Sequence, residues 1–133
     1  MALDPGDLND DVVAFLTERH LATLTTLRTD GSPHVVAVGF SYDFDARVAR
    51  VITWATAQKA VNAGRMEAAG QRAAVCQVDG GRWLSLEGPV RLVRGADAIQ
   101  PGVEGYAARY RAPKDRDDRV VIEIDVERIL GHG

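Results

Sequence analysis

Hydrophobic residues gather in several runs along this chain that are typical of β-strands: the first two are rich in Thr, Val and aromatic side chains, and the last, from Arg119 to Val126, alternates charged and apolar residues. Turn-forming residues at 28–33 separate the first two runs, and Asp79-Gly80-Gly81 separates the fourth from the fifth, so each pair predicts a hairpin. Gly88-Pro89 predicts a bulge or bend within the longest run. The predicted strands span residues 21–27, 34–42, 47–54, 72–78, 82–93 and 119–126.

Helical spacing predicts three further elements. Apolar residues between Leu8 and Leu16 follow acidic and amide residues that can cap a helix, which predicts a helix over 9–19. A second helix is predicted over 57–69, with Gly70 placed to stop it. A third is predicted over 97–110, and Pro101-Gly102 is expected to break its first turns. The charged residues 114–118 are expected to form a solvated loop.

Six largely antiparallel strands with two or three helices, and no regular strand–helix–strand order, predict a small closed or partly open barrel rather than a parallel sheet. A length of 133 residues predicts one domain, 1–133, and a hydrophobic fraction of 46% can supply a modest core.

Charge and composition exclude several classes of protein. A net charge of −3, from 16 basic and 19 acidic residues, argues against nucleic-acid binding, which usually requires a basic surface. The chain has no apolar run near the roughly 20 residues that span a bilayer, and residues 1–11 have no signal-peptide pattern. Cys76 is the only cysteine, so no internal disulfide can form. We therefore expect a soluble cytoplasmic protein without membrane or nucleic-acid partners.

The junction between the strand that ends near Thr53 and the following helix carries the clearest candidate site. Lys59 and Asn62 are three residues apart, so they share one helix face beside backbone N–H groups without intrahelical partners. Such a helix start favours an anion, and the pair is a plausible seat for a phosphate. The alternative is that both are ordinary exposed polar residues of an amphipathic helix.

Other common chemistries find no support in the sequence. His20, His34 and His132 are not at metal-ligand spacing, so no metal site is predicted. There is no GxSxG elbow, and Cys76 has no visible base beside it, so nucleophilic catalysis is not predicted. The glycine-rich fingerprint of the usual nicotinamide enzymes is also absent.

Five segments, in this order, carry a resemblance to a known family: HLATLTTLRTDGSPHVVAVGF from His20, RVITW, QKAVNAGR, CQVDGGRWLSLEG and RVVIEIDVERILG. Together they resemble the split-barrel flavin and deazaflavin oxidoreductases, the superfamily of pyridoxamine phosphate oxidase. Within it the chain is most similar to the coenzyme F420-dependent biliverdin reductases. The resemblance extends from about Leu8 to Gly131.

The resemblance implies a six-stranded antiparallel split β-barrel of the FMN-binding type that forms a homodimer with its active site between two subunits. It implies a phosphate seat at the end of the third strand and the start of the next helix. The backbone of the second strand would face the cofactor ring, and the hairpin around residue 80 would line the pocket, often that of the partner. The cofactor-binding residues implied here are Val36, Ala37, Val38, Thr53, Gln58, Lys59, Asn62, Gln77 and Trp83.

The implied activity is hydride transfer from reduced F420 to biliverdin or a related conjugated acceptor, giving bilirubin. No catalytic side chain or proton donor is identified. Arginine side chains suit the carboxylates of a polyglutamate tail or of a tetrapyrrole, and the second-tier candidates for this role lie in a late basic cluster. They are Arg109, Tyr110, Arg111, Arg116 and Arg119.

Two alternatives stay open. One is an FMN enzyme of the pyridoxamine phosphate oxidase type, which the small number of Arg and Lys residues around Thr53 to Lys59 disfavours. The other is a non-catalytic protein that stores a cofactor or a tetrapyrrole. In that case Trp54 and Trp83 are the residues most able to cover the acceptor cavity.

Overall fold

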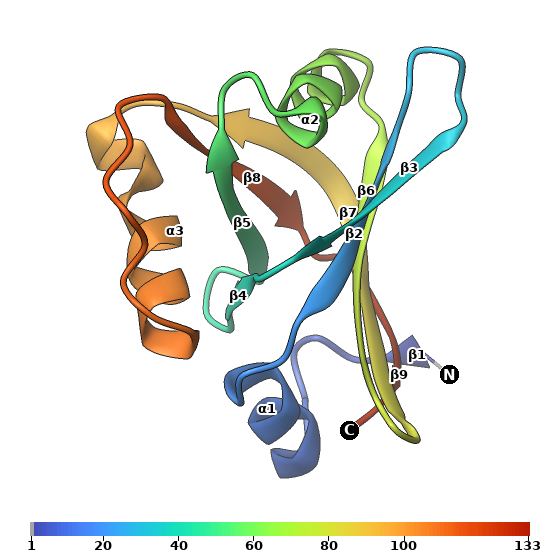
Figure 1. Cartoon of the computed structure of the whole chain (residues 1–133). Helices are drawn as coiled ribbons and strands as arrows, with labels where there is room; N and C mark the ends of the chain where they lie inside the picture. Colours follow the sequence, from blue (N-terminus) through green and yellow to red (C-terminus); the bar gives the residue numbers. More distant parts are fainter. Residues whose placement is uncertain (1) are drawn as a thin grey trace.

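The protein is built on antiparallel strands, and three helices flank them (Figure 1). The computed structural model describes residues 2–133. In chain order the elements are β1 (Ala2–Leu3), α1 (Asp10–Thr17), β2 (Ala22–Leu27), β3 (Pro33–Val38), β4 (Ser41–Asp43), β5 (Val48–Trp54), α2 (Gln58–Ala68), β6 (Arg72–Asp79), β7 (Arg82–Val93), α3 (Ala96–Arg109), β8 (Arg119–Asp125) and β9 (Arg128–His132).

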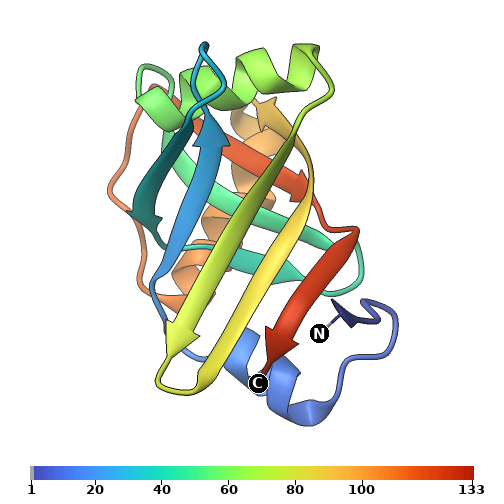
Figure 2. The same cartoon turned by 90° about the vertical axis from the view of Figure 1, so that its right-hand side faces the viewer.

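The sheet consists of two halves that share β7. Strands β3, β2, β6 and β7 lie side by side in one half, with β9 on the far side of β7 (Figure 2). Strands β7, β8, β5 and β4 form the other half. The first part of β7 pairs with β9 and its last residues, from Val90 to Val93, pair with β8. This arrangement is the split barrel expected from the sequence.

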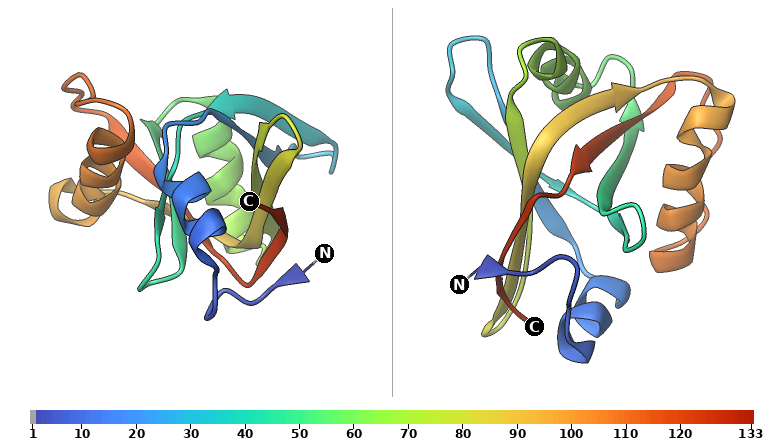
Figure 3. Two further views of the ribbon diagram at one scale, coloured as in Figure 1. Left: turned by 90° about the horizontal axis from the view of Figure 1, so that it is seen from below. Right: turned by 180° about the vertical axis from the view of Figure 1, so that it is seen from behind.

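The bend predicted at Gly88-Pro89 lies where β7 changes partners, and the strand curves strongly there (Figure 3). A Cβ atom at position 88 would lie only 1.7 Å from the carbonyl oxygen of Asp125, because the connection from β8 to β9 crosses β7 at this point. Only glycine permits this approach, so Gly88 allows the two halves of the barrel to join.

The core lies between the two halves, because each strand turns alternate side chains inward. Leu24 and Val75 come from one half, and Val51 and Ile122 from the other, and none of them is more than 1% exposed. Helix α2 covers one end of the barrel, α1 lies at the other end, and α3 packs outside on β4, β5 and β8 (Figure 1).

The helix starts and stops agree well with the sequence. The side chain of Asn9 accepts a hydrogen bond from the backbone N–H of Val12 and so caps α1. Helix α2 stops before Gly70, whose φ of +67° lies in the left-handed region. Among residues 2–133, no helix is both long enough and apolar enough to cross a lipid bilayer.

Three predictions about the elements are wrong. The run 34–42 is not one strand, because the N–H of Phe40 donates to the Tyr110 hydroxyl and its carbonyl accepts from Arg109, so it leaves the ladder between β3 and β4. Strands β1 and β9 were not foreseen, and with the split of 34–42 into β3 and β4 the described residues form nine strands rather than six. Helix α3 is unbroken: Pro101 faces solvent, and Gly102 packs against Val121.

Candidate functional site

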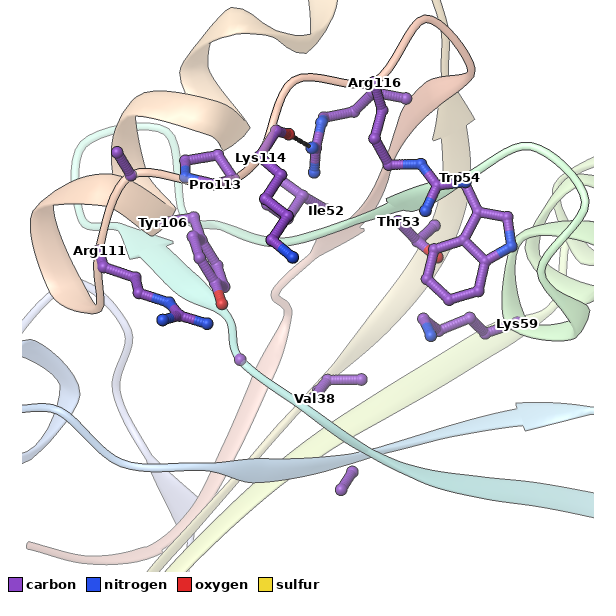
Figure 4. A pocket seen from close by; sticks show the side chains of 14 residues that line it. Val38, Ile52, Thr53, Trp54, Lys59, Tyr106, Arg111, Pro113, Lys114 and Arg116 are labelled. Atoms are coloured by element: carbon purple, nitrogen blue, oxygen red, sulfur yellow. Dashed lines mark hydrogen bonds between the residues drawn. The ribbon is translucent and has the colours of Figure 1, made fainter.

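A cavity of about 410 Å³ opens between β3, the end of β5, the start of α2 and the segment that follows α3 (Figure 4). Segments far apart in the sequence therefore meet at one place. The residues that line it are Ala37, Val38, Gly39, Ile52, Thr53, Trp54, Lys59, Tyr106, Arg111, Ala112, Pro113, Lys114, Arg116 and Arg119.

Five of these residues are cationic and none is acidic, within the part of the chain that the structure describes. Four of the five cations come from the segment after α3 and the start of β8. One of them, Arg116, forms an ion pair with Asp118 just outside the lining, with its Nε 2.9 Å from a carboxylate oxygen. The cavity is thus suited to a ligand with at least one anionic group.

One end of the cavity combines three features that suit a phosphate. The Thr53 hydroxyl is buried and has no hydrogen-bond partner among the described residues. Helix α2 begins after Ala57, and no side chain caps its first N–H groups. Burial lowers the pKa of Lys59 below its ordinary value of 10.5, because the charged form loses hydration. A bound anion would satisfy the hydroxyl, the helix start and the ammonium together.

The Trp54 indole stands beside this end, between two cations. The Lys59 Nζ lies 5.0 Å and the Arg116 Cζ 4.8 Å from its ring centroid. Figure 4 shows the guanidinium of Arg116 above the indole and the ammonium of Lys59 below it.

Small and apolar residues line the middle of the cavity, which suits a ring. Ala37, Val38 and Gly39 form one side, and Ile52 and Pro113 contribute from other elements. Strand β3 stands at the end of the strand order and pairs only with β2 in the described chain, so its outer backbone groups can address a ligand.

The opposite end is polar again. The side chains of Tyr106, Arg111 and Lys114 gather there and point toward the cavity (Figure 4). The rings of Tyr106 and Tyr110 stack with centroids 4.9 Å apart and close over Gly39, where a Cβ atom would lie 3.0 Å from Tyr106. A ligand with anionic groups at both ends would find cations at both ends.

Four of the nine predicted cofactor-binding residues line this cavity: Ala37, Val38, Thr53 and Lys59. Val36 instead packs against the hydrophobic core. Asn62 is fully buried and donates to Thr26 Oγ1, and it accepts from Gln58 at 2.8 Å. Asn62 and Gln58 therefore tie α2 to β2 and lie apart from the cavity.

Gln77 also lies away from the cavity, in a buried network around Arg109. The Arg109 guanidinium donates to Gln77 Oε1 at 2.7 Å and to the carbonyl oxygens of Phe15, Glu18 and Phe40. Burial lowers the pKa of Arg109. The network fastens α1 and the β3–β4 junction to the end of α3, from which the cationic segment starts.

The remaining candidates divide in the same way. Trp83 is part of the hairpin between β6 and β7, stacks edge-on with His132, and is not among the lining residues. Of the late basic cluster, Arg111, Arg116 and Arg119 line the cavity, whereas Tyr110 donates to the carbonyl of His20.

Sequence reasoning missed the aromatic and cationic contributions of α3 and the loop after it. Tyr106 and Lys114 were not named as candidates, although Lys114 stands in the charged run 114–118. Because this loop and the start of β8 add four cations to Lys59, the argument from a shortage of basic residues against FMN loses its force.

Comparison with known proteins gives consistent matches. Residues 8–133 match the sequence pattern of the pyridoxamine 5'-phosphate oxidase family. The chain is 55% identical over 124 residues to the F420H(2)-dependent biliverdin reductase of Mycobacterium tuberculosis, covering 93% of this chain and 88% of that protein.

Two solved structures show the same fold. A conserved hypothetical protein from Mycobacterium tuberculosis is 23% identical, with a TM-score of 0.76 over 95% of this chain and 85% of that one. A protein described as an F420 reductase is also 23% identical, with a TM-score of 0.70 over 92% of this chain and 98% of that one.

Proposed function

The chain belongs to the pyridoxamine 5'-phosphate oxidase family, and we propose that it is an oxidoreductase that transfers hydride from reduced coenzyme F420 to biliverdin or a related conjugated acceptor. The observation that carries this proposal is the cavity, which joins an apolar slot to five cations and to an unpartnered hydroxyl at an uncapped helix start. The relative named an F420H(2)-dependent biliverdin reductase, 55% identical, supports the choice of cofactor and acceptor.

The residues fit F420 in both their chemistry and their order along the cavity. Thr53, Lys59 and the first N–H groups of α2 would hold its phosphate. The backbone and small side chains from Ala37 to Gly39 would hold the ring. When bound, the reduced deazaflavin supplies the hydride from its C5 atom.

The protein's own contribution is binding and orientation. In the proposed complex the apolar slot would shield one face of the ring from water and leave the other face for a conjugated acceptor. Arg111 and Lys114, at the far end, would pair with carboxylates of the acceptor or of the cofactor's glutamate tail. Hydride transfer requires the two ligands to be stacked, and the cations at each end would set their register.

An FMN-dependent enzyme is the second candidate, because the family is named for such an oxidase and because the cavity is richer in cations than the sequence suggested. The two candidates predict different cofactors and different acceptors. An FMN enzyme would hold its flavin and use oxygen as acceptor, whereas the proposed reductase would hold F420.

The test is to mix the purified protein with reduced F420 and biliverdin under exclusion of oxygen and to follow the return of oxidised-deazaflavin absorbance. Oxidation that requires both protein and biliverdin is the expected result. An FMN titration runs beside it. Tight FMN binding with no F420 oxidation would favour the second candidate, and binding of either cofactor without turnover of any acceptor would indicate storage.

We also propose that the protein is a homodimer. Leu21, Val35 and Val78 each expose more than half of their surface, and Leu21, Ala37 and Val78 share a shallow hollow on the outer face of the β3–β2–β6 half. Because Ala37 lines both this hollow and the cavity, a second copy bound here would complete the cavity wall. Light scattering should give the mass of two chains, and Val78→Asp should reduce it to one.

A cytoplasmic location is part of the proposal. Cys76 is the only cysteine, and a protein without disulfides suits a reducing compartment. Fractionation of cells that express the tagged protein would check it.

A further inference from the structure

We propose that Trp54 is a positioning residue, which holds Lys59 and Arg116 on either side of its indole and so preorganises the anion-binding end of the cavity. The inference rests on the proposed function, because it assigns a role within the same phosphate seat. The residue would act through the two cations rather than on the reacting atoms.

The Trp54 indole makes a cation–π contact with each of two charged side chains. The Lys59 ammonium and the Arg116 guanidinium both lie within about 6 Å of the ring centroid, the range of a cation–π contact. Lys59 makes no ion pair among the described residues, so the indole is its electrostatic partner there. Arg116 is held from its other side by Asp118, through two contacts of 2.9 and 3.2 Å.

The backbone fixes where the indole stands. Trp54 is the last residue of β5 and pairs with Arg119 of β8, and its carbonyl accepts from the N–H of Ala57 at the start of α2. The strand end and the helix start thus carry the indole and Lys59 as one unit. Arg116 lies in the loop between α3 and β8, and its contact with the indole links that loop to the end of β5 and the start of α2.

Two like charges at one site repel, and both side chains are long and flexible. Without the indole they would spread into solvent, and a ligand would have to pay the entropy of gathering them. The electron-rich faces of the indole attract both charges and hold them on the cavity side before the ligand arrives. Trp54 is 37% exposed and is not part of the hydrophobic core, so packing in the core does not hold its side chain in place. The two cation contacts account for its position instead.

The test compares ligands with and without the anion. The affinities of F420 and of its deazaflavin–ribitol fragment, which lacks the phosphate, are measured by fluorescence for the wild type and for Trp54→Leu and Trp54→Phe. Phe44→Leu is the matched control, because Phe44 is 37% exposed, as Trp54 is, and lies outside the cavity. Thermal unfolding of each variant shows that it is folded.

We expect Trp54→Leu to weaken F420 binding about tenfold, from the loss of two partly exposed cation–π contacts. Its affinity for the fragment should change less than about twofold, since the fragment has no anion to meet the displaced cations. Trp54→Phe keeps an aromatic face and should retain most of the affinity, and Phe44→Leu should be unchanged.

Equal losses for F420 and for the fragment would overturn the inference, because they would show that Trp54 contacts the ring. Unchanged F420 binding in Trp54→Leu would overturn it as well. A wild type that binds F420 no better than the fragment is a different failure, since it would remove the anion site and with it the basis of the proposed function.

Discussion

Replacing Thr53 by Val should stabilise the ligand-free protein and weaken F420 binding at the same time. Thr53 is 2% exposed, and its hydroxyl is buried without a partner among the described residues. Valine has nearly the same shape, suits a β-strand and carries no polar group. The substitution therefore removes one hydroxyl and little else.

The two effects have opposite signs and can be given magnitudes. A buried hydroxyl without a partner costs about 1–3 kcal/mol, so the variant should gain about 1 kcal/mol or more in free energy of unfolding. For a domain of this size that raises the melting temperature by about 3–5 °C per kcal/mol. A lost hydrogen bond to a charged phosphate costs about 1.5–3 kcal/mol, or about 10- to 150-fold in affinity.

Thr26 offers a matched control in β2. It is 1% exposed, and its hydroxyl accepts from the Asn62 side-chain amide at 3.1 Å. Thr26→Val leaves that amide buried without its partner, so it should lose about 1–2 kcal/mol of stability and keep its affinity for F420. Urea unfolding and fluorescence titration measure both quantities in both variants. A Thr53→Val protein that is destabilised like Thr26→Val, or that binds F420 as the wild type does, would refute the reasoning.

Three further predictions concern charge, the buried network and the barrel junction. Lys59→Ala should weaken F420 binding by about 1.5–3 kcal/mol. In the wild type, F420 affinity should fall as pH rises through the Lys59 pKa, because only the protonated form pairs with the phosphate. Since burial lowers that pKa, the fall should begin below pH 10.5. Lys59→Arg should remove this alkaline loss in titrations across pH. Arg109→Met should cost about 3 kcal/mol or more in urea unfolding, because Gln77 and three buried carbonyls lose a charged donor; a stability near that of the wild type would contradict the role of the network. Gly88→Ala should prevent formation of the β8–β9 crossing, since its Cβ would lie 1.7 Å from the Asp125 carbonyl oxygen, and a folded variant with native far-UV and near-UV circular dichroism would contradict it.

The sequence predicts the local elements well, because alternation and capping are local properties. The helix start at Asn9 and the hairpin around Gly80-Gly81 depend on neighbouring residues alone, and the structure has both. Strand β9 was missed because it is short and contains Gly131, and it forms only where β7 offers a partner. Its existence depends on residues more than 40 positions away.

Only part of the candidate site could be predicted, because the sequence does not show which distant elements pack together. Lys59 and Asn62 do lie on one face of α2, but the barrel covers Asn62 with β2 and leaves Lys59 at the cavity. Periodicity gives the face of a helix and not the element that packs on it. Arg111 and Lys114 line the same cavity as Thr53 although more than 50 residues of sequence separate them from it, so no local pattern could place them together.

The most direct measurement of the central claim is the transfer of an isotope label. Reduced F420 carrying two deuterium atoms at C5 is mixed with the protein and biliverdin in ordinary water, and the bilirubin is examined by mass spectrometry and NMR. We expect one deuterium on the central bridge carbon, which is a methine in biliverdin and a methylene in bilirubin, because the proposed reaction passes hydride directly from C5 to that carbon without exchange with water. Bilirubin without the label, or no bilirubin at all, would contradict it.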